Sequence, residues 1–457
     1  MMKKNSTNSN NKSINYNSYL DTALKQERKR MGYPLTGSIV GLFTPLGWKK
    51  TSTGTKLVDN RIFGISPDSI SDTLIIGIGD PEPSLASEQS RQEKGIYYIE
   101  DIENDIIRIL AKYFKSDLNE IKGYVTSGGT EANLASVWWL RNYLNNLVKN
   151  KFSDQILSSK TSAILYASDQ SHYSCKKICQ ILNIELIEIP SFENGQMNTG
   201  CLTNKLQIHM LNEPHRPLIV WANAGTTILG AVDNIQVIDN ILSSEVRDKN
   251  GVCAVHTDGV ILAMTFPLLY PQYASIFKYT DTLSISGHKL LATSSVCGVV
   301  LAKKNIVHHA FDNTDISVAY VHGIKDITVT GGRSSLPIFQ LHASLKKLGI
   351  DNNTTNFRKL IHQCLHNVDI LVKGLRLIIG HQHVFNNPRQ FNVIFPLLLN
   401  AEHAEILKEK YSLMPLENNR VCITIFPNVD KKLIIKFLND YQDCLKSEQQ
   451  SSLRCKL

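Results

Sequence analysis

Short apolar runs alternate with longer, helix-sized segments through the middle of the chain, and this alternation restricts the possible folds more than any other feature. The runs span residues 163–167, 184–189, 218–222, 252–256, 282–286 and 297–302. Buried parallel strands have this length and continuous hydrophobicity, and each needs a crossover segment before its neighbour. The pattern therefore predicts an α/β fold, a mainly parallel sheet flanked by helices. In such sheets, ligands bind where the strands end.

The chain is long enough to form more than one domain. Its 457 residues exceed the size at which a single hydrophobic core usually stops growing. Residues 1–20 contain six Asn and four Ser with little to bury, which is typical of a flexible tail. We expect five parts: this tail at 1–20, a proline-interrupted arm or cap at 21–100, a large sheet domain at 101–330, a smaller C-terminal α+β domain at 331–445, and a second tail at 446–457.

Composition and charge argue against several classes of protein. The formal charge is +8, but basic residues are interspersed with acidic ones, so no nucleic-acid partner is expected. No run reaches the roughly 18 apolar residues of a membrane span, and the N-terminus lacks an apolar signal core. We therefore expect a soluble, cytoplasmic protein that does not bind membranes.

The cysteines and histidines do not form a recognisable metal site. The nine cysteines show neither a disulfide framework nor a Cys-x-x-Cys pair, and we expect Cys175 and Cys179 to be small buried residues. His308 and His309 are adjacent, but no carboxylate or cysteine ligands accompany them in order. We expect these two histidines to be exposed, and no bound metal.

Two turns carry the first candidate site residues. Residues 127–131 read Ser-Gly-Gly-Thr-Glu, and two glycines before a helix start, among them Gly129, would present backbone N–H groups to an anion such as a phosphate. The alternative is a tight loop with Thr130 as a helix N-cap. His172 follows a predicted strand, where an imidazole can stack on an aromatic ligand or exchange protons near neutral pH. A purely structural histidine is the alternative there.

Two further strand ends supply a carboxylate and a lysine. Asp258, in His-Thr-Asp-Gly, needs a cation or hydrogen-bond donors, because an unpaired buried charge is very costly. A pyridinium nitrogen would serve, and so would a helix N-cap or a structural ion pair. Lys289 ends the run Ser-Ile-Ser-Gly-His-Lys in a largely apolar setting, which disfavours its ammonium form and makes the amine available for imine chemistry. Ser286 and His288 beside it could complete a phosphate cup.

Five motifs occur in the order that one known family shows. They are the Gly-Gly-Thr-Glu loop, Ser-His-Tyr-Ser, Ala-Gly-Thr-Thr at 224–227, His-x-Asp-Gly and Ser-Gly-His-Lys. From Gly79 to Pro427 the chain resembles the fold-type I pyridoxal-phosphate decarboxylases of group II. Within that family it is most similar to the bacterial histidine decarboxylases and plant serine decarboxylases, which carry Asp-Gly where most relatives have Asp-Ala.

This resemblance implies a role for each candidate residue. Lys289 would hold pyridoxal 5'-phosphate as a Schiff base, Asp258 would pair with the pyridine nitrogen, and His172 would stack on the ring and contact the substrate. Thr226 would lie beside the ring. The residues implied to hold the phosphate are Gly129, Thr130, Ser286 and His288. The resemblance also implies a homodimer.

The implied reaction is the α-decarboxylation of an L-amino acid to a primary amine and carbon dioxide. Histidine is the leading substrate and serine the next, although the segment that faces the substrate in bacterial histidine decarboxylases differs here. Tyr97, Tyr98 or Tyr320 could reach the substrate. Another lyase or an aminotransferase would use the same residues, because these reactions diverge only after the cofactor has engaged the substrate. A non-catalytic binding subunit with this fold is the third alternative.

Overall fold

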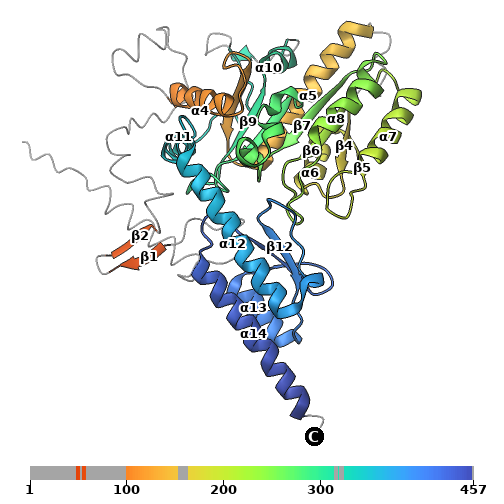
Figure 1. Cartoon of the computed structure of the whole chain (residues 1–457). Coiled ribbons are helices and arrows are strands. Elements are labelled where there is room, and N and C mark those ends of the chain that lie inside the picture. The colour runs from red at the N-terminus through yellow and green to blue at the C-terminus, as the bar shows by residue number, and fades with distance from the viewer. Residues whose placement is uncertain are drawn as a thin grey trace, which may run out of the picture.

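A computed structural model describes residues 48–51, 54–57, 99–152, 163–312, 317–318 and 324–454 of the chain (Figure 1). The expected tail at 1–20 and nearly all of the arm at 21–100 lie outside these residues, as do Tyr97, Tyr98 and Tyr320. Within the arm, an antiparallel pair is described, formed by β1 (Trp48–Thr51) and β2 (Gly54–Leu57).

A seven-stranded sheet forms the centre of the large domain. In spatial order its strands are β3 (Ile121–Thr126), β9 (Gly298–Lys303), β8 (Thr282–Ser286), β7 (Cys253–Asp258), β6 (Leu218–Asn223), β4 (Ile164–Ser168) and β5 (Glu185–Ile189). All neighbours from β8 to β5 are parallel, whereas β9 is antiparallel to both β3 and β8. The predicted α/β class and mainly parallel sheet are confirmed. Because β4, β6 and β8 are buried along their whole length, their sequences are continuously apolar or small.

Helices cover both faces of this sheet. They are α4 (Ile99–Tyr113), α5 (Gly129–Phe152), α6 (Ser174–Leu182), α7 (Thr199–Asn212), α8 (Ile235–Leu242), the short α9 (Phe266–Leu269) and α10 (Lys304–Ala310). Val220 of β6 packs in one apolar cluster with α7 and α8. Its neighbours Ile219 and Trp221 pack in a second cluster with α5 and α6, which contains the buried Cys175 and Cys179. This division follows from the alternation of side chains along a strand.

Strand β3 is not evident from the apolar pattern, because it contains Lys122 and Gly123. Gly123 permits a close approach to β9, since a Cβ atom there would lie 2.1 Å from the carbonyl oxygen of Val300. The strand is recognisable only once β9 lies beside it.

A smaller unit follows at the C-terminal end of the chain. Its elements are α11 (Leu336–Leu348), α12 (Thr355–Ile379), β12 (Asn392–Pro396), α13 (Ala401–Tyr411), β13 (Met414–Pro415), β14 (Arg420–Thr424) and α14 (Lys431–Arg454). The three strands form an antiparallel sheet in the order β12-β14-β13. Phe395 of β12 packs against Phe437 and Tyr441 of α14. The C-terminal sheet and helices confirm the expected α+β character.

Helical segments lie close to both expected boundaries of this unit, at residues 330 and 445. Residues 446–454, expected to begin a tail, continue α14 without a break, and Glu448 pairs with His403 at 2.8 Å. Helix α11 begins after the expected boundary at residue 330, yet it lies against α4 of the large domain, where His342 and Lys346 both contact Asp105. Figure 1 shows α12 leading from this region toward the small sheet. The division at 330 stays a prediction.

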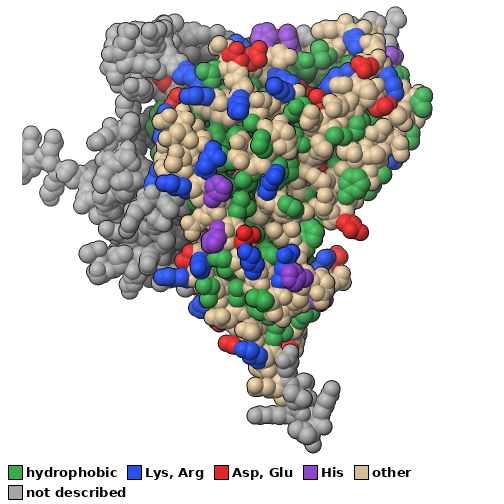
Figure 2. Space-filling view, in the orientation of Figure 1, with side chains coloured by type: hydrophobic (Ala, Val, Ile, Leu, Met, Phe, Trp, Pro, Cys, Tyr) green, Lys and Arg blue, Asp and Glu red, His purple; other side chains and the backbone are tan. Residues whose placement is uncertain are grey.

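Two short strands, β10 (Ser317–Val318) and β11 (Ile324–Lys325), pair between α10 and α11. Within the described residues, no helix is long and apolar enough to cross a membrane. The face in Figure 2 carries Lys and Arg side chains scattered among Asp, Glu and apolar ones, without a basic stripe.

Candidate active site

The predicted site residues lie at one edge of the seven-stranded sheet. Asp258 is the last residue of β7, and Ser286 is the last residue of β8. His172 and Thr226 follow β4 and β6, which run parallel to those strands. The glycine loop after β3 reaches the same edge, because β3 and β8 both run antiparallel to β9 between them. The fold thus gathers segments that are far apart in the sequence.

The glycine loop leads directly into α5. This helix begins at Gly129, so Thr130 lies inside the first turn and is not the N-cap that the alternative interpretation required. The first N–H groups of a helix have no acceptor within the helix, and its dipole favours an anion there. Glycine is needed at 129, because a Cβ atom would lie 2.7 Å from Cγ1 of Val260. Anion binding by this loop stays a prediction.

The turn after β8 lies beside this loop. Gly298, the first residue of β9, pairs with Ser286, and a Cβ atom at Gly298 would lie 2.7 Å from the backbone of Gly128. Oγ of Ser286 lies 3.0 Å from Nδ1 of His288, which is also 3.0 Å from the carbonyl oxygen of Cys297. Ser286 and His288 are therefore fixed close to the start of α5.

Lys289, Asp258 and His172 are close enough for the charge of each to influence the others. Burial lowers the pKa of Lys289 to about 8, partly opposed by the Asp258 carboxylate. Burial raises the pKa of Asp258, while Lys289 and His172 oppose that shift. Burial lowers the pKa of His172, Asp258 raises it, and Lys289 lowers it further. An amine, a carboxylate and an imidazole thus share a poorly hydrated site, as acid–base chemistry near neutral pH requires.

The loop that carries His172 is anchored on both sides. Nδ1 of His172 lies 2.8 Å from the hydroxyl of Ser174, the first residue of α6. The hydroxyl of Ser171 accepts a hydrogen bond from the side chain of Asn223, which also donates to the buried Asp233. These bonds tie the end of β6 to the loop and limit the positions of the imidazole.

Thr226 closes a tight turn after β6. Its hydroxyl oxygen accepts a hydrogen bond from the backbone N–H of Ala231 at 3.0 Å, and the side chain is buried. Gly225 before it has a φ of +101°, a conformation that favours glycine. The turn has a structural role; the place of Thr226 beside a cofactor ring stays a prediction.

Sequence reasoning did not single out Asn133 and His256. Asn133 contacts the carboxylate of Asp258, and His256 contacts Asn133. Nδ2 of Asn133 donates to Oδ2 of Asp258 at 3.0 Å. Oδ1 of Asn133 lies 3.1 Å from Nε2 of His256. Helical spacing from Gly129 would have pointed to Asn133 one turn later, and strand alternation would have placed His256 on the same face as Asp258.

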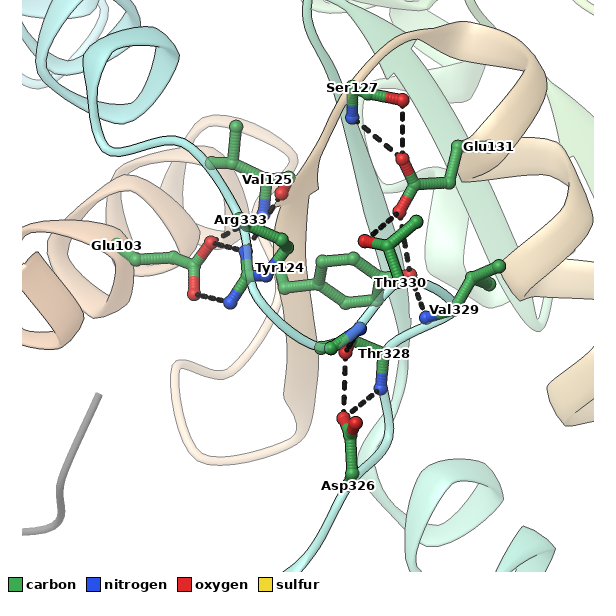
Figure 3. A network of polar contacts seen from close by, with 11 residues as sticks. Glu103, Tyr124, Val125, Ser127, Glu131, Asp326, Thr328, Val329, Thr330 and Arg333 are labelled. Atoms are coloured by element: carbon green, nitrogen blue, oxygen red, sulfur yellow. Dashed lines mark hydrogen bonds and ion pairs between the residues drawn. The ribbon is translucent and has the colours of Figure 1, made fainter. Parts of the chain in front are cut away.

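A polar network fastens residues 326–333 to the base of the glycine loop (Figure 3). Glu131 accepts hydrogen bonds from Ser127 and Thr330, while Tyr124 accepts one from the backbone N–H of Val329. Arg333 extends the network on the other side of Tyr124, as Figure 3 shows.

Arg333 joins α4 to β3. It forms a two-pronged ion pair with Glu103 and donates to the carbonyl oxygen of Val125 at 2.8 Å. Its guanidinium lies 4.8 Å from the ring centroid of Tyr124. Arg333, at the end of the Gly331-Gly332-Arg333 turn, thus supports the strand that leads into the glycine loop.

The expectation for His308 and His309 needs one correction. Both are exposed, as predicted, but a carboxylate does accompany them: Oδ2 of Asp312 lies 2.7 Å from Nδ1 of His309. The turn after α10 places Asp312 beside His308 and His309. The sequence reasoning compared their spacing with known metal-ligand patterns and therefore missed this contact. A hydrogen bond between His309 and Asp312 accounts for this contact.

Comparison with known proteins identifies the family. The conserved domain of the pyridoxal-dependent decarboxylases matches residues 98–397. The chain belongs to this family. It is therefore a pyridoxal-phosphate-dependent amino-acid decarboxylase, a carboxy-lyase.

Relatives of known sequence and structure agree with this membership. The decarboxylase is 28% identical to histidine decarboxylase of Vibrio anguillarum over 297 residues, covering 65% of this chain and 69% of that protein. It is 27% identical to histidine decarboxylase of Acinetobacter baumannii over 343 residues, covering 74% and 79%.

Two solved structures share the fold of the decarboxylase. L-methionine decarboxylase from Streptomyces sp.590 has a TM-score of 0.66 and 16% identity, with 93% of each chain covered. Lactobacillus brevis glutamate decarboxylase has a TM-score of 0.67 and 15% identity, with 98% of this chain and 95% of that chain covered.

The groups at this sheet edge suit pyridoxal 5'-phosphate. A lysine with a lowered pKa can react with an aldehyde, and a buried carboxylate can accept a hydrogen bond from a ring nitrogen. The start of α5 offers N–H donors for a phosphate. The amine, the carboxylate and the start of α5 come from three different segments, and each suits a different group of the cofactor.

Proposed function

We propose that this decarboxylase converts L-histidine to its primary amine and carbon dioxide, with pyridoxal 5'-phosphate carried by Lys289. The mutual influence of Lys289, Asp258 and His172 at the carboxyl ends of the strands supports the placement of the reaction. The substrate rests on the similarity to two histidine decarboxylases, at 27–28% identity.

Each residue has a proposed part in holding the cofactor. Lys289 would bind its aldehyde, Asp258 its ring nitrogen, and His172 would lie over the ring and contact the substrate. Thr226 would lie beside the ring. The phosphate would be held by Gly129, Thr130, Ser286 and His288. Convergence of these residues at one sheet edge, with a helix N-terminus among them, supports this assignment.

The cofactor supplies an electron sink for the pair of electrons released when the carboxylate leaves as carbon dioxide. The residues of this chain then have three tasks. Asp258, shielded from water and held by Asn133, favours a proton on the ring nitrogen. Lys289, with its pKa near 8, can hold or release a proton at Nζ near neutral pH. His172 would cover the cofactor ring and limit the access of water.

A cytoplasmic homodimer is part of the proposal. The family resemblance supports the dimer, and the reduced cysteines agree with a reducing compartment: all eight cysteines among the described residues have free thiols. Sedimentation equilibrium of the purified protein tests the dimer, and a monomer at micromolar concentration would contradict it.

The substrate is tested by incubating the purified holoenzyme with each standard amino acid in turn. Carbon dioxide release and the amine product, identified by mass spectrometry, are measured together. Histidine is expected to give the highest kcat/KM. A preference for serine or another amino acid would overturn the substrate assignment alone. A keto-acid product without gas would contradict the decarboxylation itself.

A further inference from the structure

A buried line of hydrogen bonds runs behind Asp258. The hydroxyl of Thr282 lies 2.9 Å from Nδ1 of His256, and Nε2 of His256 lies 3.1 Å from Oδ1 of Asn133. Nδ2 of Asn133 then lies 3.0 Å from Oδ2 of Asp258. The four side chains are at most 5% exposed, and they come from β8, β7 and α5. Water therefore has little access to replace any of these bonds.

The direction of each bond in this line follows from Asp258. An ionised carboxylate only accepts, so the amide of Asn133 must turn its NH2 group toward Asp258 and its oxygen toward His256. His256 must then carry its proton on Nε2, which leaves Nδ1 to accept from the Thr282 hydroxyl. Every donor meets an acceptor, with His256 neutral. The reversed amide would place two oxygens against each other.

We propose that Asn133 and His256 are positioning residues that orient the Asp258 carboxylate toward the ring nitrogen of pyridoxal 5'-phosphate. This proposal rests on the proposed role of Asp258. A second hydrogen bond to that carboxylate is longer, because the backbone N–H of Val260 donates to Oδ1 at 3.3 Å. Asn133 thus fixes one oxygen, and His256, fixed in turn by Thr282, prevents the amide from rotating.

Helix α5 links this line to the anion-binding loop. Asn133 lies one turn after Gly129, so the same rigid helix offers its N-terminus to the phosphate and the Asn133 amide to Asp258. The spacing between the two ends of the cofactor site is therefore built into one helix. The charged groups that face Asp258 are Lys289 and His172.

The test compares two ligands in several variants of the apoprotein. The ligands are pyridoxal 5'-phosphate and its analogue with carbon in place of the ring nitrogen. Asn133→Leu keeps the approximate shape of the side chain but removes the amide. Thr282→Val is a milder change at the far end of the line. The matched control is Thr257→Val, because Thr257 lies in β7 between His256 and Asp258, and its buried hydroxyl bonds Thr280 on the opposite face.

Equilibrium titration gives the affinity of each variant for both ligands. We expect Asn133→Leu to reduce the preference for the natural cofactor over the analogue by about ten- to a hundredfold, which corresponds to one hydrogen bond to a charged group. Thr282→Val should reduce the preference less, and Thr257→Val should leave it unchanged. If Asn133 had a purely structural role, its replacement would weaken the binding of both ligands equally and leave the preference for the natural cofactor unchanged.

Two results would overturn the proposal in different ways. If the wild-type protein prefers the natural cofactor but Asn133→Leu and Thr282→Val retain that preference, the positioning role is wrong and the role of Asp258 stands. If the wild-type protein binds both ligands equally, Asp258 does not pair with the ring nitrogen, and the assignment under the proposed function fails as well.

Discussion

Glu131 accepts hydrogen bonds from both the backbone N–H and the hydroxyl of Ser127, at 2.9 and 2.5 Å. Its side chain is buried, and it connects the first turn of α5 with the last residue before the two glycines. The carboxylate therefore holds the loop against the first turn of α5.

Glu131→Gln is expected to weaken this brace, because both Ser127 bonds end on Oε2 and a neutral amide oxygen accepts them less strongly than a carboxylate oxygen does. We expect a loss of about 1–3 kcal/mol in the free energy of unfolding, together with weaker binding of the cofactor. Urea unfolding and cofactor titration measure the two effects. Ser127→Ala, which removes only the hydroxyl bond, should cost less. Equal costs for both variants would show that the charge of Glu131 adds nothing to the brace beyond the Ser127 hydroxyl bond.

Lys289→Ala is expected to abolish covalent attachment of the cofactor and nearly all activity, because no other amine replaces Nζ as the aldehyde-reactive group. Borohydride reduction followed by peptide mass spectrometry should find a pyridoxyl group on Lys289 in the wild-type protein and none in the variant. Circular dichroism serves as the control for folding. A trapped pyridoxyl group on a different lysine of the wild-type protein would disprove the assignment.

The pH dependence of stability should carry a contribution from His256. Burial lowers the pKa of this imidazole to about 3, below the usual 6.5 of an unfolded chain. Between those two pH values the unfolded state binds a proton that the folded state does not. The contribution of His256 to the free energy of unfolding is therefore fully present above pH 6.5 and is lost as the pH falls toward 3. The contribution amounts to about 3–5 kcal/mol across this window.

His256→Phe removes the titrating group and tests this contribution in the apoprotein. The free energy of unfolding, measured in urea from pH 4 to 8, should depend less on pH in the variant than in the wild type. The variant will also lose stability at pH 8, because it leaves Asn133 without its partner. Parallel curves for the two proteins would show that His256 does not contribute to the acid sensitivity.

Arg333 and Glu103 form an ion pair whose side chains are only 16% and 11% exposed. Arg333→Met is expected to destabilise the fold by about 3 kcal/mol, because it leaves the Glu103 carboxylate buried without its cation. The double variant Glu103→Met, Arg333→Met should recover part of this loss, since no uncompensated charge remains. Urea unfolding measures the loss of unfolding free energy in each variant. A loss in the double variant that exceeds the sum of the losses in the two single variants would contradict the pairing.

Several elements could be predicted because their burial pattern is local. The run 282–286 coincides with β8, and the run 218–222 matches β6 to within one residue. Both strands are buried throughout, so their sequences are hydrophobic or small along their length. β3 shows the limit of this reasoning, because Gly123 is favoured by the closeness of β9 and weakens the strand signal. The helical residues after 445 show the same limit, because Glu448 contacts His403 of a different helix, and this contact is not visible in the local sequence.

The sequence by itself determined the fold class, the family and the positions of the candidate residues, because strand length, helix period and motif order are local properties of the chain. The tertiary structure decided which other side chains form hydrogen bonds or ion pairs with the candidate residues and the segments that carry them. Asn133 meets Asp258 across 125 residues, and Glu103 meets Arg333 across 230. A hydrogen-bond partner is selected by where the packed strands and helices place each group, and no local pattern carries that information.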